Sequence, residues 1–114
     1  MENIIVNLTP HNVNIVLDDG RVITIERSGM VARCAQQTQK VNEINYSNAN
    51  AIIPITQTTY GEVVDLPEPK ENVYYIVSRL VLTACPYRTD LLVPNQVVRN
   101  EHGQIVGCQS LANS

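Results

Sequence analysis

Short apolar runs separated by turn residues cover most of the chain and predict a β-rich domain. Residues 3–8 contain a continuous apolar run, which is typical of a strand buried on both faces inside a sheet. Apolar and polar residues alternate over 13–17, and β-favouring residues return over 22–25, with Asp19-Gly20 between them. Because a tight hairpin turn needs a positive φ that glycine adopts without strain, this pattern predicts a β-hairpin over residues 13–25.

A strand followed by a short helix is predicted in the second half of the chain. The β-favouring run at 73–77 gives way at Ser78 to residues that suit a helix near 78–85. A serine side chain at this position caps the first turn, and Pro86 cannot continue the helix. A further strand is expected at 89–93.

The last apolar runs predict a closing hairpin. Val97-Val98-Arg99 and Gln104-Ile105-Val106 flank the turn-forming sequence Asn100-Glu101-His102-Gly103. The pattern favours two antiparallel strands over these residues.

The middle of the chain has a weaker pattern. A third short strand is expected at 30–35, whereas 36–50 is rich in Gln and Asn, with few apolar residues. This polar stretch is either an excursion of two poorly packed strands or a loop that a ligand or partner orders, and an ordinary surface connection is the commoner outcome. Strand character returns over 51–64, where Pro54 indicates an edge or a bulge.

These elements define the fold class. We expect a single α+β domain over 1–114, mainly an antiparallel sheet of about seven or eight short strands, with one short helix near 78–85. No run approaches the roughly 20 apolar residues of a membrane span. The N-terminal sequence lacks the features of a signal peptide, so a cytoplasmic protein is expected.

Charge and cysteine content restrict the partners. A net charge of −3 and a pI near 5.2 argue against long nucleic acids, which recruit basic surfaces, but are compatible with a small anionic ligand. The cysteines Cys34, Cys85 and Cys108 are far apart and form no CxxC pair. We therefore expect buried free thiols, with no metal site and no cofactor.

Three arginines at element ends are candidate phosphate ligands: Arg79, Arg88 and Arg99. A guanidinium offers a planar fork of donors, and free amides at a helix start add partial positive charge. The alternative is that each arginine is solvated or pairs with Asp90 or Glu101.

Tyrosine and asparagine complete the predicted ligand site. Tyr74 or Tyr87 is expected to stack on a base, and one ring of the Tyr74-Tyr75 pair should enter the core. Asn95 and Asn100 are candidates for contacts with a ribose or a base edge. Both also suit turns, which is the alternative role.

The chain lacks the local motifs of known enzyme classes. His11 is the best candidate for acid–base chemistry, but the alternative is that it ties its own turn together. A nucleotide hydrolase would need His11 beside Asp90 or a cysteine. We predict a protein that is not an enzyme.

A set of short motifs resembles small proteins encoded by bacteriophages and prophages. The motifs span most of the chain except the polar middle: Val6-Asn7-Leu8-Thr9-Pro10-His11 with Val13, Leu66-Pro67-Glu68-Pro69, Ile76-Val77-Ser78, Arg88-Thr89-Asp90, Pro94, Val98-Arg99-Asn100 and Gly103-Gln104-Ile105-Val106-Gly107-Cys108. Within that set, the chain is similar to the first family of Thoeris anti-defence proteins, the phage sponges that trap cyclic ADP-ribose isomers and, in some members, cyclic oligonucleotides.

The resemblance implies a sponge in the infected bacterial host cell. Such a protein binds an immune signalling nucleotide without degrading it and forms a homo-oligomer with pockets at subunit contacts. The alternative is a phage interaction or assembly module with no nucleotide ligand, which would use the strand edge near Pro54 and the Asn-rich middle.

Overall fold

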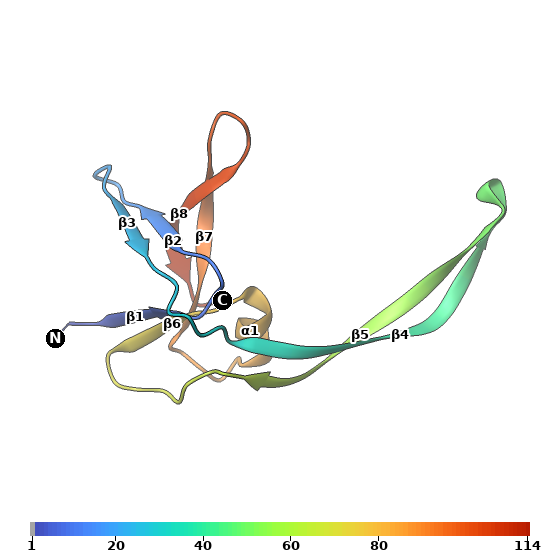
Figure 1. Ribbon diagram of the computed structural model, residues 1–114, viewed down its shortest axis with the longest axis horizontal. Coiled ribbons are helices and arrows are strands. Elements are labelled where there is room, and N and C mark those ends of the chain that lie inside the picture. Colours follow the sequence, from blue (N-terminus) through green and yellow to red (C-terminus); the bar gives the residue numbers. More distant parts are fainter. Residues whose placement is uncertain (1) are drawn as a thin grey trace.

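The computed structural model describes residues 2–114 and contains eight strands and one α-helix within that range (Figure 1). The elements in chain order are β1 (Ile4–Asn7), β2 (Val13–Val16), β3 (Val22–Ile25), β4 (Arg33–Tyr46), the 3-10 turn η1 (Ser47–Ala49), β5 (Ala51–Val64), β6 (Val73–Ile76), α1 (Arg79–Ala84), β7 (Leu91–Arg99) and β8 (Ile105–Ala112). The predicted class, a small α+β domain with a mainly antiparallel sheet, is confirmed.

Six strands form one sheet in the order β1-β6-β7-β8-β2-β3. The hairpins β2–β3 and β7–β8 are antiparallel, as predicted, and Gly20 turns the first of them with a φ of 90°. The pairs β1–β6, β6–β7 and β2–β8 are parallel. Parallel pairing places strands from both ends of the chain in one continuous sheet.

Helix α1 packs against β7 of the sheet and against the base of β4 and β5. The Ser78 side chain accepts a hydrogen bond from the Val81 amide at 3.3 Å, so the predicted cap is present. Val81, Leu82 and Cys85 are buried against the sheet together with Tyr75. One ring of the tyrosine pair therefore enters the core, as predicted, because successive strand residues point to opposite faces. The described part of the chain has no helix long and apolar enough to cross a membrane.

A close approach of two backbones joins β2 to β8. The two strands run parallel, and Ile15 of β2 lies opposite Cys108 of β8. An added Cβ at Gly107 would lie 2.9 Å from the Asn14 carbonyl oxygen. Glycine at this position therefore allows β8 to reach β2 and complete the sheet.

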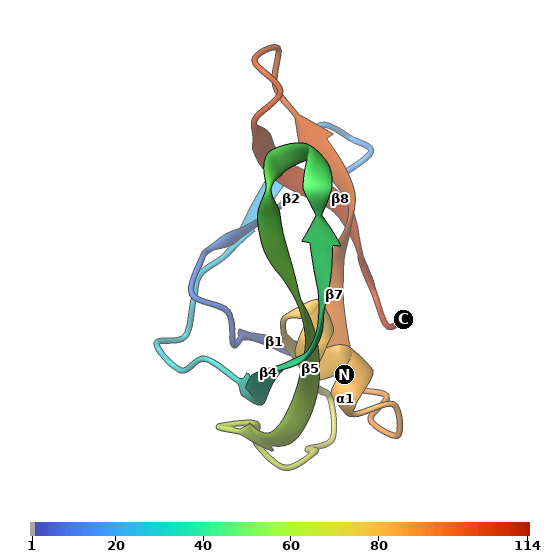
Figure 2. The ribbon, with the colours of Figure 1, turned by 90° about the vertical axis from the view of Figure 1, so that its right-hand side faces the viewer.

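Strands β4 and β5 form a long two-stranded arm that projects from the body (Figures 1 and 2). Cys34 and Val63 pack against the core at its base, and η1 closes its tip. The radius of gyration is 18.5 Å, whereas about 13 Å is expected for a compact domain of this length. The arm accounts for this difference.

Three predictions about strands are corrected by the structure. The run at 3–8 is not buried on both faces: β1 is an edge strand, and Ile4 and Ile5 are exposed. The strand expected at 30–35 begins at Arg33 and continues to Tyr46, so most of 36–50 belongs to β4, one strand of the poorly packed β4–β5 pair, and not to a surface connection. The runs at 89–93 and 97–99 form the single strand β7.

Candidate functional site: a groove at the β2–β8 junction

An apolar groove with a polar rim lies where β2 and β8 meet. Its volume is about 430 Å³, within the range of small-molecule sites. The lining side chains come from the turn after β1, from β2, from the start of α1 and from the β7–β8 hairpin: Thr9, His11, Asn12, Val13, Asn14, Val77, Ser78, Arg79, Val93, Pro94, Val97, Ile105, Val106, Gly107 and Cys108.

The turn after β1 is organised by the buried side chain of Asn7. Its Nδ2 donates to the carbonyl oxygens of His11 at 2.8 Å and Ile25 at 3.0 Å, and its Oδ1 accepts from the Thr9 amide at 3.0 Å. The Thr9 hydroxyl lies 2.6 Å from Asn7 Oδ1. These contacts fix the backbone that presents Thr9 and His11 at the groove.

The groove carries one permanent charge, the guanidinium of Arg79. This side chain is exposed, follows the helix cap directly, and makes no hydrogen bond or ion pair with another residue in 2–114. Among residues 2–114, no carboxylate lines the groove. The rim therefore favours an anionic group, because a free cation without a nearby acid attracts negative charge.

Neutral polar groups surround this charge. Asn14 accepts a hydrogen bond from the Thr24 hydroxyl at 2.7 Å and donates weakly to the Val106 carbonyl at 3.4 Å. The backbone of His11 takes part in the turn built by Asn7, whereas its imidazole makes no hydrogen bond or ion pair with another of the described residues. The His11 carbonyl thus accepts hydrogen bonds within its turn, whereas its side chain is exposed at the groove.

The inner wall of the groove is apolar. Val97, Ile105 and Val106 of the β7–β8 hairpin are 45 to 61% exposed there. Cys108 is buried, with its Sγ 3.5 Å from the Asn14 carbonyl oxygen. Burial raises the pKa of the Cys108 thiol, although hydrogen bonds from backbone amides oppose the shift. The thiol is therefore protonated, and so unreactive, near neutral pH.

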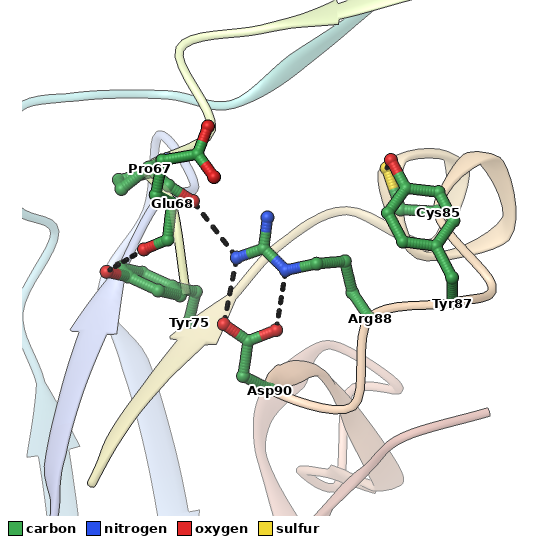
Figure 3. Close-up of polar contacts among 7 residues, drawn as sticks. All are labelled: Pro67, Glu68, Tyr75, Cys85, Tyr87, Arg88 and Asp90. Carbon is green, nitrogen blue, oxygen red and sulfur yellow. Dashed lines mark hydrogen bonds and ion pairs between the residues drawn. The ribbon is translucent and has the colours of Figure 1, made fainter. Parts of the chain in front are cut away.

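A second hollow contains Arg88, but here the charge is already paired (Figure 3). Arg88 Nε and Nη2 donate to the two carboxylate oxygens of Asp90, both at 2.8 Å, and Nη2 also donates to the Pro67 carbonyl at 3.0 Å. Both side chains are largely buried, with 10 and 14% exposed. The arginine therefore has the pairing role with Asp90 that the sequence left open.

Electrostatics in this hollow disfavour a phosphate. The hydrogen bonds from Arg88 hold the pKa of Asp90 below its ordinary value, so the carboxylate is charged at neutral pH. Glu62 and Glu68 also line the hollow. The exposed Tyr87 has its hydroxyl 4.0 Å from the Cys85 sulfur, and this contact is the largest cause of its raised pKa.

The other predicted ligand residues lie elsewhere. Arg99 donates to the Gly103 carbonyl at 2.8 Å, and the Asn100 side chain accepts from the amides of His102 and Gln104, so both shape the β7–β8 turn. Tyr74 is on β6 and Asn95 on β7, and neither lines the groove or the second hollow.

The seven predicted residues thus do not share one cavity in the single chain. Arg79 lines the groove, Tyr87 and Arg88 line the second hollow, and the remaining four lie outside both.

Several groove residues were not recognised as candidates from the sequence: Thr9, Asn12, Asn14, Val97, Ile105 and Val106. The signal available for Thr9 was its place in the turn sequence Asn7-Leu8-Thr9-Pro10-His11. Nothing local marks the apolar residues, because the junction that gathers them depends on pairing between distant strands.

No group of three or more His, Cys, Asp or Glu side chains that could hold a metal ion occurs in residues 2–114. The three cysteines are unpaired. Comparisons with family models, with curated proteins and with solved structures found no match to this chain. The groove and the sequence motifs are therefore the basis for a proposed function.

Proposed function

We propose that this protein binds and sequesters a small anionic nucleotide in the groove at the β2–β8 junction without degrading it. The observation that carries the proposal is the free guanidinium of Arg79 at the rim of an apolar groove that contains no carboxylate. A phosphate would bind this guanidinium through charge-assisted hydrogen bonds, which are stronger than neutral ones.

The remaining lining suits the other parts of a nucleotide. Val97, Ile105 and Val106 offer an apolar wall for a base, and burial of a flat ring there removes apolar surface from water. Asn12 and Asn14 carry amide groups that match the donors and acceptors of a ribose or a base edge. The charge of Arg79 therefore suits a phosphate, the apolar wall suits a base, and the amide groups suit a sugar.

Sequestration is favoured over turnover by the environment of the reactive groups. Hydrolysis needs a base oriented by a third group, or an activated nucleophile. The His11 imidazole has no orienting side chain among the described residues, and the Cys108 thiol is kept neutral by burial. These features support a binding role.

The proposed biological role is that of a phage anti-defence sponge. The resemblance described for the sequence motifs suggests a cyclic ADP-ribose isomer or a cyclic oligonucleotide as the signal, bound by a homo-oligomer in the infected host cell. A sponge needs nanomolar affinity, about −12 kcal/mol. A neighbouring subunit that covers the groove would supply additional contacts.

The test is ligand capture followed by mass spectrometry. The purified protein is incubated with cyclic ADP-ribose isomers and with cyclic di- and trinucleotides, free ligand is removed, and the protein is denatured. Recovery of an intact nucleotide supports the proposal. A cleaved product identifies an enzyme, and no recovered nucleotide favours an interaction module.

Variants locate the site. Arg79→Ala should weaken binding of the captured nucleotide about tenfold or more in calorimetry, because a hydrogen bond to a charged group contributes about 1.5 to 3 kcal/mol. Arg21→Ala removes the same charge from an arginine that pairs with Asp19 on the surface and should leave the affinity unchanged. Equal binding by both variants would contradict the groove assignment. Arg99→Ala tests the arginine cluster predicted from the sequence.

A further inference from the structure

The side-chain amide of Asn12 offers donors to the groove at the β2–β8 junction. Asn12 Oδ1 accepts a hydrogen bond from the backbone amide of Arg27 at 2.9 Å. A backbone amide can only donate, so it faces the oxygen of the Asn12 side chain and not the nitrogen. The Nδ2 group, which carries two N–H donors, makes no hydrogen bond with another residue in 2–114.

Asn14 is oriented in the same sense from the neighbouring strand. Thr24 lies directly across the β2–β3 ladder from Asn14, and its hydroxyl donates to Asn14 Oδ1 at 2.7 Å. On the other side, Asn14 Nδ2 donates to the Val106 carbonyl at 3.4 Å, which is long for a bond of this type. A carbonyl can only accept, so the nitrogen faces β8. One N–H of Asn14 is therefore weakly bound, and the other has no partner among the described residues.

The start of α1 adds two further donors. Ser78 Oγ accepts from the Val81 amide at 3.3 Å, and the hydroxyl hydrogen of Ser78 has no acceptor within residues 2–114. The guanidinium of Arg79 carries donors and no acceptor. Four side chains that line the groove thus offer free or weakly bound donors: Asn12, Asn14, Ser78 and Arg79.

The other polar side chains of the groove do not balance these donors with acceptors. The Thr9 hydroxyl lies 2.6 Å from Asn7 Oδ1 and 2.9 Å from the His11 carbonyl, so its hydrogen is used within the turn. The Thr9 oxygen accepts from the His11 amide at 3.5 Å. The Cys108 thiol donates to the Asn14 carbonyl at 3.5 Å. The His11 ring can act as donor or acceptor, so free donors outnumber free acceptors among the described lining side chains.

We infer that the groove recognises its ligand through the hydrogen-bond acceptors of the ligand, with Asn12 and Asn14 as specificity-determining residues and Thr24 as the residue that positions Asn14. The inference rests on the proposed nucleotide binding and narrows the class of ligand. Phosphate oxygens, base carbonyls and unprotonated ring nitrogens fit these donors. An exocyclic amine turned toward them would place donor against donor and leave both without a partner, which disfavours binding.

Thr24 acts from outside the groove, because it does not line the cavity. Without its hydroxyl, the Asn14 amide would be free to rotate and turn its oxygen toward the ligand. The long bond to Val106 does not prevent ligand binding, because Nδ2 can exchange that carbonyl for a better-placed acceptor. Thr24 therefore fixes which end of the Asn14 amide the ligand meets.

NMR titration tests whether the two amides donate to the ligand. The wild-type chain is titrated with each of the cyclic ADP-ribose isomers and cyclic di- and trinucleotides. The side-chain amide signals are assigned by their loss in Asn12→Ala and Asn14→Ala. For a nucleotide that binds, the amide protons of Asn12 and Asn14 should move downfield, since a hydrogen bond to an acceptor deshields the proton. The side-chain amide of Asn48, at the end of the arm, should not respond.

Calorimetry with the same nucleotide tests the role of Thr24. Thr24→Val should weaken binding about three- to tenfold, and Thr24→Ser, which keeps the hydroxyl, should bind as the wild type does. In the Asn14→Ala variant, Thr24→Val should have no further effect, because the group that it positions is gone. Thr58→Val is the matched control: it removes a hydroxyl that bonds across the arm to Thr38 at 3.0 Å, away from the groove, and should leave the affinity within about twofold.

The outcomes separate this inference from the proposed function. If the wild-type chain binds none of these nucleotides, both fail. If it binds a nucleotide and the amide signals of Asn12 and Asn14 stay in place, the inference alone is overturned. Equal affinity of the wild type and Thr24→Val, or a full additional loss in the Asn14→Ala background, would reject the positioning role of Thr24.

Discussion

Arg88 binds Asp90 through two parallel hydrogen bonds of 2.8 Å, in a largely buried position beside the segment that connects β5 to β6. A third bond from Arg88 reaches the Pro67 carbonyl at 3.0 Å. The pair therefore fastens the start of β7 to the proline-containing connector. Its role is structural, and each of its charges balances the other.

This pair predicts a loss of stability in acid. Because hydrogen bonds from Arg88 lower the pKa of Asp90 in the folded state, the pair stabilises the protein above the unfolded value of about 3.9. That contribution disappears as pH falls through the lower, folded pKa. Urea unfolding at pH 7 and pH 3 should show this decrease. Asp90→Asn should lower the free energy of unfolding at pH 7 by about 2 to 4 kcal/mol and reduce its dependence on acidic pH. An unchanged pH profile would contradict this prediction.

The close approach at Gly107 predicts sensitivity to a single methyl group. Gly107→Ala places a Cβ 2.9 Å from the Asn14 carbonyl oxygen, so β8 must move away from β2. The expected loss is about 1 to 3 kcal/mol in denaturant unfolding. Gly61→Ala is the control, because its Cβ would meet the Ala35 side chain at 3.4 Å, at the limit of ordinary contact. Similar losses for both variants would show that the β2–β8 junction is not specially constrained.

The buried amide of Asn7 predicts that the turn after β1 depends on one side chain. Asn7→Ala leaves the carbonyl oxygens of His11 and Ile25 and the amide of Thr9 without their present partner. We expect a cost of about 2 to 4 kcal/mol, since each unsatisfied buried group costs about 1 to 3 kcal/mol and water will reach some of them. Asn95→Ala, at an exposed position, should change the unfolding free energy by less than about 0.5 kcal/mol.

Thiol reactivity should follow burial. Cys34 is partly exposed at the base of the arm, whereas Cys85 and Cys108 are buried. In the native protein, a disulfide reagent at pH 8 should modify Cys34 first, and Cys108 should react slowly because burial raises its thiol pKa. The Cys34→Ser variant should lack the fast phase. Guanidinium chloride should make all remaining thiols react rapidly.

Much of the fold could be predicted because the signals are local. The Asp19-Gly20 turn and the Ser78 cap each act within a few residues, and the structure contains both the hairpin and the helix that they predict. The burial of β1 could not be predicted in this way. A continuous apolar run fits a central strand, but sheet order decides exposure, and here β1 is at the edge.

The arm shows a related limit. Its strands carry few apolar residues, and the bulges at Cys34–Gln36 and Lys40–Asn42 interrupt the alternation that would have revealed two long strands. That Ile44, Ile53 and Ile55 lie on one side of the arm becomes visible only when the register is known. Pro54 was correctly placed at an edge, because a two-stranded arm has no central strand.

The candidate site could be predicted only in part. Each of the three predicted arginines lies near the end of a helix or strand. In the folded chain, however, these ends lie on different surfaces. The local sequence did contain the partner of Arg88, since Asp90 follows it by two residues. Arg79 has no such neighbour, and it is the arginine that the structure leaves free at the groove.

The contact between β2 and β8 also constrains the order of folding. Asn14 and Cys108 are 94 positions apart in the sequence, although they touch in the sheet. Closing so long a loop is slow compared with forming the β2–β3 and β7–β8 hairpins, so the local hairpins should precede it. During synthesis, β2 therefore has an unpaired edge until residue 108 has left the ribosome. The groove, which lies at this same junction, should therefore form late in folding.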